Sequence, residues 1–190
     1  MAEIHNTTMS PTKLELLDRW LPEQPWYAGT GRPDLNRAGG FRLDDPDGEV
    51  GIEFMFVRDD ANGDGTTYQV PMTYRGEALA GAPEAALIGT SEHGVLGTRW
   101  IYDGAHDPAL LAQLVALLEG AAEPQHQSKS DTADPTVHVE QVASGSVDSE
   151  SLRILRVLVP DPHAGRTGCV TATWRTADDR EERGPVVLLD

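Results

Sequence analysis

The sequence predicts an α+β protein with a curved antiparallel β-sheet and two helices, followed by a small four-stranded antiparallel β region. Two segments carry leucines at helical spacing, two adjacent strand-like runs flank a turn, and four further strand-like runs follow residue 135. We expect residues 1–119 to form the first domain and residues 120–135 a polar linker. Residues 136–190 then form the β region, which either packs on the first sheet or extends it.

Residues 11–21 predict the first helix. Ser10 is a good N-cap and Pro11 suits the first helical position, although Thr12 and Glu15 offer an alternative capping box. The apolar face of this helix carries Leu14, Leu17 and Leu21. One face of the helix is therefore expected to pack on the sheet.

The clearest hairpin comes next. Residues 26–33 predict a packed aromatic anchor and a tight turn, and the polar, glycine-rich residues to about Gly40 predict a loop. Residues 50–58 predict a strand, and residues 67–75 predict its return strand across an Asp-, Asn- and Gly-rich turn. Pro71 within the return strand indicates an edge position or a bulge.

The second helix begins after Asp107, which is the expected N-cap, with Pro108 at the first position. Short strand-like runs at residues 86–89 and 100–102 precede it. Residues 120–135 carry almost no apolar side chains, which favours a linker. The strand-like runs beyond it are 136–142, 152–159, 168–175 and 185–189.

The composition excludes several classes of function. The 31 acidic and 15 basic residues give a net charge of −16, which argues against binding to nucleic acid or to an anionic membrane. There is no apolar stretch of spanning length and no signal-peptide pattern at the N-terminus. Cys169 is the only cysteine, so it is expected to be a small buried hydrophobe. We therefore expect a cytoplasmic protein.

Two groups of polar residues resemble metal or acid–base sites. Asp60, Asn62 and Asp64 match the first half of a calcium loop, but the twelfth position is Pro71 instead of a bidentate Glu, and a hairpin turn needs the same residue types. His93, Asp103, His106 and Asp107 lack the spacing of a known metal signature, and a polar rim at the helix start explains them better. We expect neither a metal nor any other cofactor.

Several runs are similar to one known family. Residues 20–32 (WLPEQPWYAGTGR) resemble the run that opens the N-terminal cap subdomain of actinobacterial maltokinases, although Pro25 and Thr30 stand where that family has basic residues. Residues 68–75 (YQVPMTYR) resemble a later run of that cap. So do Ile88-Gly89 and residues 102–108 (YDGAHDP), in the same order. The resemblance covers about residues 12–119.

The resemblance implies a cap without kinase lobes. In maltokinases the cap precedes a subdomain with the nucleotide loop and a lobe with the catalytic Asp and the magnesium ligands, whereas residues 136–190 show neither a phosphate-cradling loop nor a strand lysine. We expect a free-standing, non-catalytic accessory module of trehalose, maltose or α-glucan metabolism. Its partner would be a carbohydrate or a protein, either a sugar kinase or an α-glucan enzyme. The candidate ligand or partner surface comprises Trp26, Tyr27, Arg32, Tyr74, Arg75 and His106.

Two alternatives stay open. A small carbohydrate-active enzyme or sugar kinase would need metal together with arginines such as Arg32 and Arg75 for ATP-dependent phosphotransfer, since neither Lys13 nor Lys129 lies in a strand-like run. A structural protein would instead oligomerise through an exposed edge strand at residues 185–189.

Overall fold

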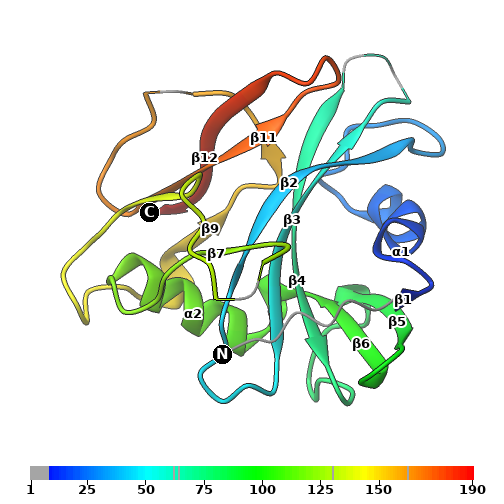
Figure 1. Ribbon diagram of the computed structural model, residues 1–190, viewed down its shortest axis with the longest axis horizontal. Helices are drawn as coiled ribbons and strands as arrows, with labels where there is room; N and C mark the ends of the chain where they lie inside the picture. The colour runs from blue at the N-terminus through cyan, green and yellow to red at the C-terminus, as the bar shows by residue number, and fades with distance from the viewer. Residues whose placement is uncertain (1–8, 62, 64, 130, 162) are drawn as a thin grey trace.

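The structure is a computed structural model that describes residues 9–61, 63, 65–129, 131–161 and 163–190. Helix α1 (Lys13–Trp20) covers one side of an eight-stranded antiparallel sheet, sheet A, and helix α2 (Pro108–Leu118) lies on the other side with a four-stranded antiparallel sheet, sheet B (Figure 1). The α+β prediction is confirmed, including the curvature of the first sheet and the four strands of the second. In the described part of the chain, neither helix is long and apolar enough to cross a membrane.

Sheet A has the strand order β1-β5-β6-β4-β3-β2-β7, with β10 also paired to β4. Its strands are β1 (Met9–Ser10), β2 (Leu35–Leu43), β3 (Gly51–Asp59), β4 (Thr66–Arg75), β5 (Leu87–His93), β6 (Gly97–Asp103), β7 (Gln125–His126) and β10 (Val157–Leu158). Sheet B has the order β8-β11-β12-β9, formed by β8 (His138–Glu140), β9 (Leu152–Ile154), β11 (Cys169–Arg175) and β12 (Glu181–Leu189). Short 3-10 turns are η1 (Leu21–Glu23), η2 (Glu84–Ala86), η3 (Gly104–His106) and η4 (Ser149–Ser151).

Helix α1 begins at the alternative cap. The backbone N–H of Glu15 donates to Thr12 Oγ1 at 3.3 Å, and the backbone N–H of Thr12 donates to Glu15 Oε2 at 2.7 Å. Ser10 belongs to β1, so the prediction of Ser10 as the N-cap was wrong. The reciprocal capping box satisfies two backbone donors at once, which a serine cap without a matching acidic residue does not.

Strand β2 (Leu35–Leu43) begins within residues that the sequence predicts as a loop, and that prediction was wrong at residues 35–40. A Cβ atom at Gly40 would lie 2.1 Å from the carbonyl oxygen of Phe54 on β3. Gly39 and Gly40 both have positive φ angles, and the register with β3 shifts beside them. The glycines that suggested a loop therefore permit a bulge and a close approach of two strands.

The hairpin of β3 and β4 is confirmed, and the position of Pro71 has a clear cause. Along the edge of β4 away from β3, β6 pairs with residues 72–75 and β10 with residues 67–68. The N–H of Gln69 points to that edge, where it donates to the carbonyl oxygen of Arg156 at 2.8 Å. The nitrogen of Pro71, two residues further along β4, faces the same edge. It lies in the gap between β10 and β6, so the missing N–H of proline removes no hydrogen bond between strands.

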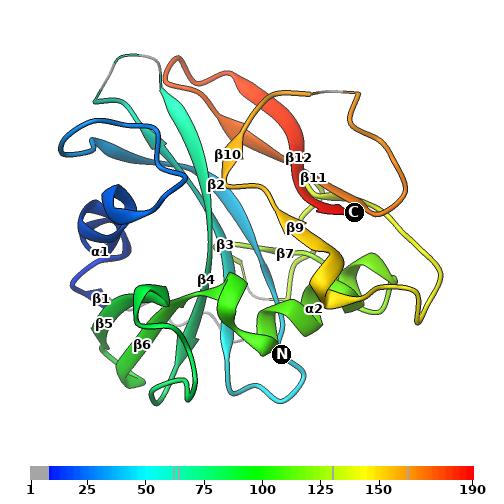
Figure 2. The ribbon, with the colours of Figure 1, turned by 180° about the vertical axis from the view of Figure 1, so that it is seen from behind.

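Sheet A separates two apolar clusters. The cluster on the α1 side contains Leu16, Leu17, Trp20, Leu21, Met55, Val57, Tyr68, Val70, Met72, Ile88 and Ile101. The cluster on the other side includes Phe41, Phe54, Phe56, Leu110, Leu114, Leu117, Val170, Trp174, Val186 and Val187. The second cluster is continuous from sheet A through α2 to sheet B, so residues 136–190 pack on the first sheet and also add β10 to it (Figure 2).

The polar segment at residues 120–135 lies along sheet A. Its strand β7 pairs with β2, with His126 opposite Phe41, and Gln127 Nε2 donates to Glu53 Oε1 at 2.8 Å. These polar contacts explain why the segment needs few apolar side chains to be held there.

The predicted pairing edge at residues 185–189 was wrong. Strand β12 lies between β11 and β9, with Val187 opposite Val170 on one side and Ile154 on the other. The residues of β9 lie more than thirty positions earlier in the chain, so the sequence pattern around β12 carries no signal of this second partner.

Candidate functional site

The aromatic run after η1 turns inward. The Trp26 ring lies 5.9 Å from the Trp20 ring and 6.0 Å from the Tyr68 ring, measured between centroids. The guanidinium carbon of Arg156 lies 5.0 Å from the centre of the Trp26 ring, within the range of a cation–π interaction. Trp26 is half-buried between these groups. It therefore anchors its loop to β4 and to the segment before β10.

Tyr27 also holds this loop in place. Its hydroxyl donates to Asp59 Oδ2 at 2.7 Å, while Asp59 Oδ1 accepts the backbone N–H groups of Asp34 and Ala61. Burial and the hydrogen bond to the Asp59 carboxylate raise the pKa of Tyr27 well above its ordinary value. A Cβ atom at Gly29 would lie 2.2 Å from the Tyr27 hydroxyl, so only glycine leaves room for this bond.

A buried carboxylate, Glu53, accepts three hydrogen bonds on the α1 side of sheet A and lies near a further cation. Lys13 Nζ and the Tyr74 hydroxyl each lie 2.5 Å from Glu53 Oε2, and Gln127 Nε2 lies 2.8 Å from Oε1, with Arg37 at 3.7 Å. Burial acts to raise the pKa of Glu53, but the charge and hydrogen bond of Lys13, the hydrogen bond of Tyr74 and the charge of Arg37 together outweigh it, so the pKa is lowered. Burial, followed by the charge of Glu53, raises the pKa of Tyr74 well above its ordinary value.

Arg75 lies on the opposite side of sheet A. Its Nε and Nη2 each lie 2.7 Å from a different oxygen of Asp107, whose side chain is fully buried. Asp107 also accepts the backbone N–H of Ala109 at 2.9 Å, as the predicted N-cap of α2. Burial opposes ionisation, yet the hydrogen bond from Arg75 holds the pKa of Asp107 below its ordinary value. His106 beside it is exposed.

A second buried ion pair, formed through a single guanidinium nitrogen, joins the end of β6 to the C-terminal region. Arg156 Nη2 lies 2.7 and 2.9 Å from the two oxygens of Asp103, at the end of β6. The adjacent Gln69 is fully buried and donates from Nε2 to the carbonyl oxygens of Leu155 and Val186, at 2.9 and 2.8 Å. The sequence reasoning missed Arg156 and Gln69 because their partners lie more than fifty residues away.

Arg32 and the acidic turn complete the predicted set. Arg32 is exposed and pairs with Asp18 at 3.0 Å, beside a shallow cleft of about 470 Å³. Asp60 is paired with Arg58, whose Nε lies 2.7 Å from Asp60 Oδ1. Asn62 and Asp64 lie outside the described residues. Within the described ranges, no three His, Cys, Asp or Glu side chains converge as metal ligands would.

The structure distributes the six candidate residues over several places. Trp26 and Tyr27 lie together beside Tyr68, while Tyr74 and Arg75 point to opposite faces of β4. His106 lies at the start of α2, and Arg32 lies beside α1. Most of these side chains are engaged by other groups of the same chain, so they position elements of the fold and do not converge on one place.

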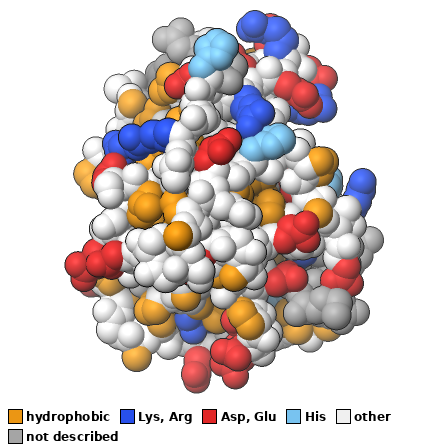
Figure 3. Space-filling model, turned by 90° about the vertical axis from the view of Figure 1, so that its left-hand side faces the viewer, with side chains coloured by type: hydrophobic (Ala, Val, Ile, Leu, Met, Phe, Trp, Pro, Cys, Tyr) orange, Lys and Arg blue, Asp and Glu red, His pale blue; other side chains and the backbone are white. Residues whose placement is uncertain are grey.

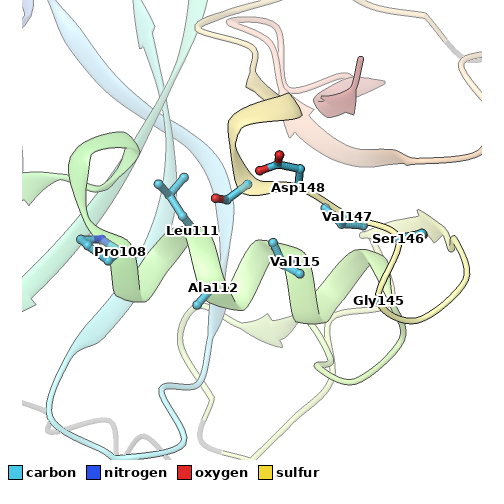
Figure 4. A pocket seen from close by; sticks show the side chains of 9 residues that line it. Pro108, Leu111, Ala112, Val115, Gly145, Ser146, Val147 and Asp148 are labelled. Carbon is cyan, nitrogen blue, oxygen red and sulfur yellow. The ribbon is translucent and has the colours of Figure 1, made fainter.

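An open groove lies elsewhere, along the outer face of α2. It has a volume of about 840 Å³ and runs between α2 and the loop at residues 145–149 (Figure 4). Its lining consists of Pro108, Leu111, Ala112, Val115, Gly145, Ser146, Val147, Asp148 and Ser149. The sequence reasoning did not name this surface. The composition of α2 could have indicated this surface, because Gln113 is the only polar side chain of the helix.

A comparison with known protein families agrees with this architecture. The maltokinase N-terminal cap domain family matches residues 20–107, from the last residue of α1 to the N-cap of α2. The match contains the inward-facing aromatic loop, the β3–β4 hairpin and the acidic residue of the Arg75–Asp107 pair. Residues 20–107 are therefore similar to the maltokinase N-terminal cap domain.

Proposed function

We propose that this chain is a non-catalytic, maltokinase-related cap module that acts by binding a protein partner. The partner class is a sugar kinase or an α-glucan enzyme of trehalose, maltose or glycogen metabolism. One observation carries the proposal: polar residues in this region form ion pairs and hydrogen bonds with one another. Arg75 forms an ion pair with Asp107, and the Tyr74 hydroxyl donates a hydrogen bond to Glu53. Acid–base or phosphoryl-transfer chemistry needs such groups within reach of a substrate, whereas here they are engaged in contacts with other side chains of the same chain.

The packing favours a protein partner over a carbohydrate. A sugar platform needs an exposed aromatic face, but the Trp26 ring is covered by Arg156 and packs beside Tyr68 and Trp20. By contrast, the groove on α2 is open and mostly apolar, as protein-binding surfaces are at their centre.

The test uses the purified chain in two assays. Sugar kinases and α-glucan enzymes of the source organism are immobilised separately, and binding of the chain to each is measured by interferometry. In parallel, ATP turnover by the chain alone is measured with maltose. The proposal predicts saturable binding to at least one of these enzymes and no turnover above the buffer background. ATP turnover by the chain, or no saturable binding to any of these enzymes, would overturn it.

A further inference from the structure

Helix α2 is apolar around most of its circumference. Its inner face, with Leu110, Leu114, Leu117 and Leu118, is buried in the core shared with sheet B. Its outer face carries an apolar stripe at positions i, i+3, i+4 and i+7, formed by Pro108, Leu111, Ala112 and Val115. Ala112 is exposed, and Leu111 and Val115 are only half-buried. A helix that is apolar on both faces is normally covered on both.

The groove has the dimensions to hold a short helix. Residues 108–115 span about 10 Å at the rise of an α-helix, which is about two helical turns. The loop at residues 145–149 forms the opposite wall, as the close-up shows (Figure 4). The loop is fixed to the helix because the backbone N–H of Val147 donates to Glu119 Oε1 at 3.2 Å. This hydrogen bond therefore connects the two walls of the groove, helix α2 and the loop.

The charges at the groove are acidic. Asp148 is the only charged residue in its lining, and Glu119 lies at the C-terminal end of α2. Hydrogen bonds from the backbone N–H groups of Gly145 and Val147 lower the pKa of Glu119. The last turn of α2 has no basic residue, so the negative end of the helix dipole adds to the two carboxylates. Figure 3 shows hydrophobic side chains on this side of the molecule, with acidic and basic side chains around them.

We infer that this groove binds an amphipathic helix of the partner protein, with its apolar face against α2 and an Arg or Lys beside Asp148. The inference rests on the proposed function and names the surface and the partner chemistry. Helix-in-groove recognition uses apolar anchors at the spacing that α2 presents. The chain carries a net charge of −16, so a second copy would bring repulsion to this surface, whereas a basic partner would bring attraction.

The probe is a pair of synthetic amphipathic helical peptides with the same leucine and alanine face. One peptide carries Arg beside that face, and the other carries Glu at the same positions. Binding of each to the full chain is measured by fluorescence anisotropy at two salt concentrations. We expect the Arg peptide to bind at least tenfold more tightly than the Glu peptide, with the difference shrinking at high salt.

Three variants locate the binding. Ala112→Arg places a long cation in the groove at an exposed helical position and should abolish binding of the Arg peptide. Ala80→Arg adds the same cation at an exposed position outside the groove and should leave binding within about twofold of wild type. Asp148→Asn keeps an acceptor for the Glu150 N–H, which Asp148 Oδ1 now accepts at 3.0 Å, and should weaken binding several-fold.

Equal affinity for the two peptides, no binding of either, or binding unaffected by Ala112→Arg would each overturn the inference. A dimer of the chain alone, dissociated by Ala112→Arg in light scattering, would also overturn it and assign the groove to a second copy. If an enzyme binds the chain and Ala112→Arg leaves that binding unchanged, this inference fails while the proposed function stands. If no enzyme binds at all, the proposed function itself fails.

Discussion

At the scale of single residues, buried carboxylates connect separate elements of the fold. Glu53 joins β3 to α1, β4 and the segment after β7, and Asp107 joins β4 to the start of α2. The sequence predicted Asp107 as an N-cap because capping is local. It could not predict that Arg75, 32 residues earlier, is the partner of Asp107, because that pairing depends on the register of β4 and β6.

Replacing Arg75 tests the first of these pairs. Arg75→Met should lower the free energy of unfolding by about 3 kcal/mol, because it leaves the fully buried Asp107 without its cation. Urea unfolding at pH 7 measures the change. The matched control is Arg153→Met, since the Arg153–Asp190 pair is exposed at both ends and should contribute less than about 1 kcal/mol. Equal effects of the two substitutions would contradict this account.

The Glu53 network predicts a pH dependence. The pKa of Glu53 is lower in the folded chain than in the unfolded chain, so its contribution to stability is complete above the unfolded pKa and is lost as the pH falls through the folded pKa. Unfolding free energies from pH 7 to pH 3 should therefore decline below about pH 4.5.

Lys13 supplies the test of that cause. Lys13→Met removes the nearest cation, so burial is less opposed and the pKa of Glu53 should lie higher than in the wild type. A folded pKa that is less depressed gives a smaller loss of stability on acidification, so the decline between about pH 4.5 and pH 3 should shrink or disappear. Lys13→Arg keeps the charge and should restore the wild-type decline. Identical pH profiles for the wild type and Lys13→Met would show that the Lys13–Glu53 pair does not control this dependence.

At the scale of elements, local signals predicted some segments and not others. The β3–β4 hairpin and α2 were predicted because alternation, turn residues and an Asp-Pro start are all local. Strand β2 was missed because Gly39 and Gly40 serve a close approach to another strand, which a sequence pattern cannot distinguish from a loop. Arg156 was missed for the same reason, since its role depends on a contact with Asp103.

A substitution at Gly40 tests the close approach of β2 to β3. Gly40→Ala should lower the free energy of unfolding by about 3 kcal/mol, since the methyl group meets the Phe54 carbonyl and the positive φ angle adds strain. Gly48→Ala is the control, because Gly48 also has a positive φ angle but open space around it, so only strain of about 1 kcal/mol remains. Thermal or urea unfolding of both variants measures the difference, and a similar loss in both would show that the close approach is not what requires Gly40.

At the scale of the whole molecule, the shared core predicts cooperative unfolding. Gln69 on β4 donates to the carbonyl oxygens of Leu155 and Val186, and the apolar cluster runs from Phe54 to Trp174. Native-state hydrogen exchange should give the same opening free energy for core amides of β3–β4 and of β11–β12, and Gln69→Ala should lower both equally. Opening of β11–β12 at a lower free energy would instead show two independently unfolding units.

The contacts across the whole molecule indicate which surface is open to a partner protein. Asp107 and Asp103 are buried in ion pairs with Arg75 and Arg156, while α2 leaves an apolar stripe open beside Asp148. The sequence indicated the cap family from runs at residues 20–108, but the groove needs a loop that follows α2 by more than twenty residues. Only the folded chain places that loop opposite the helix.

Sedimentation velocity of the full chain with a purified sugar kinase or α-glucan enzyme from the source organism tests this claim most directly. We expect a complex that sediments faster than either protein with the wild type and with Ala80→Arg, and no complex with Ala112→Arg. Two independent boundaries for every such enzyme, or an undiminished complex with Ala112→Arg, would contradict it.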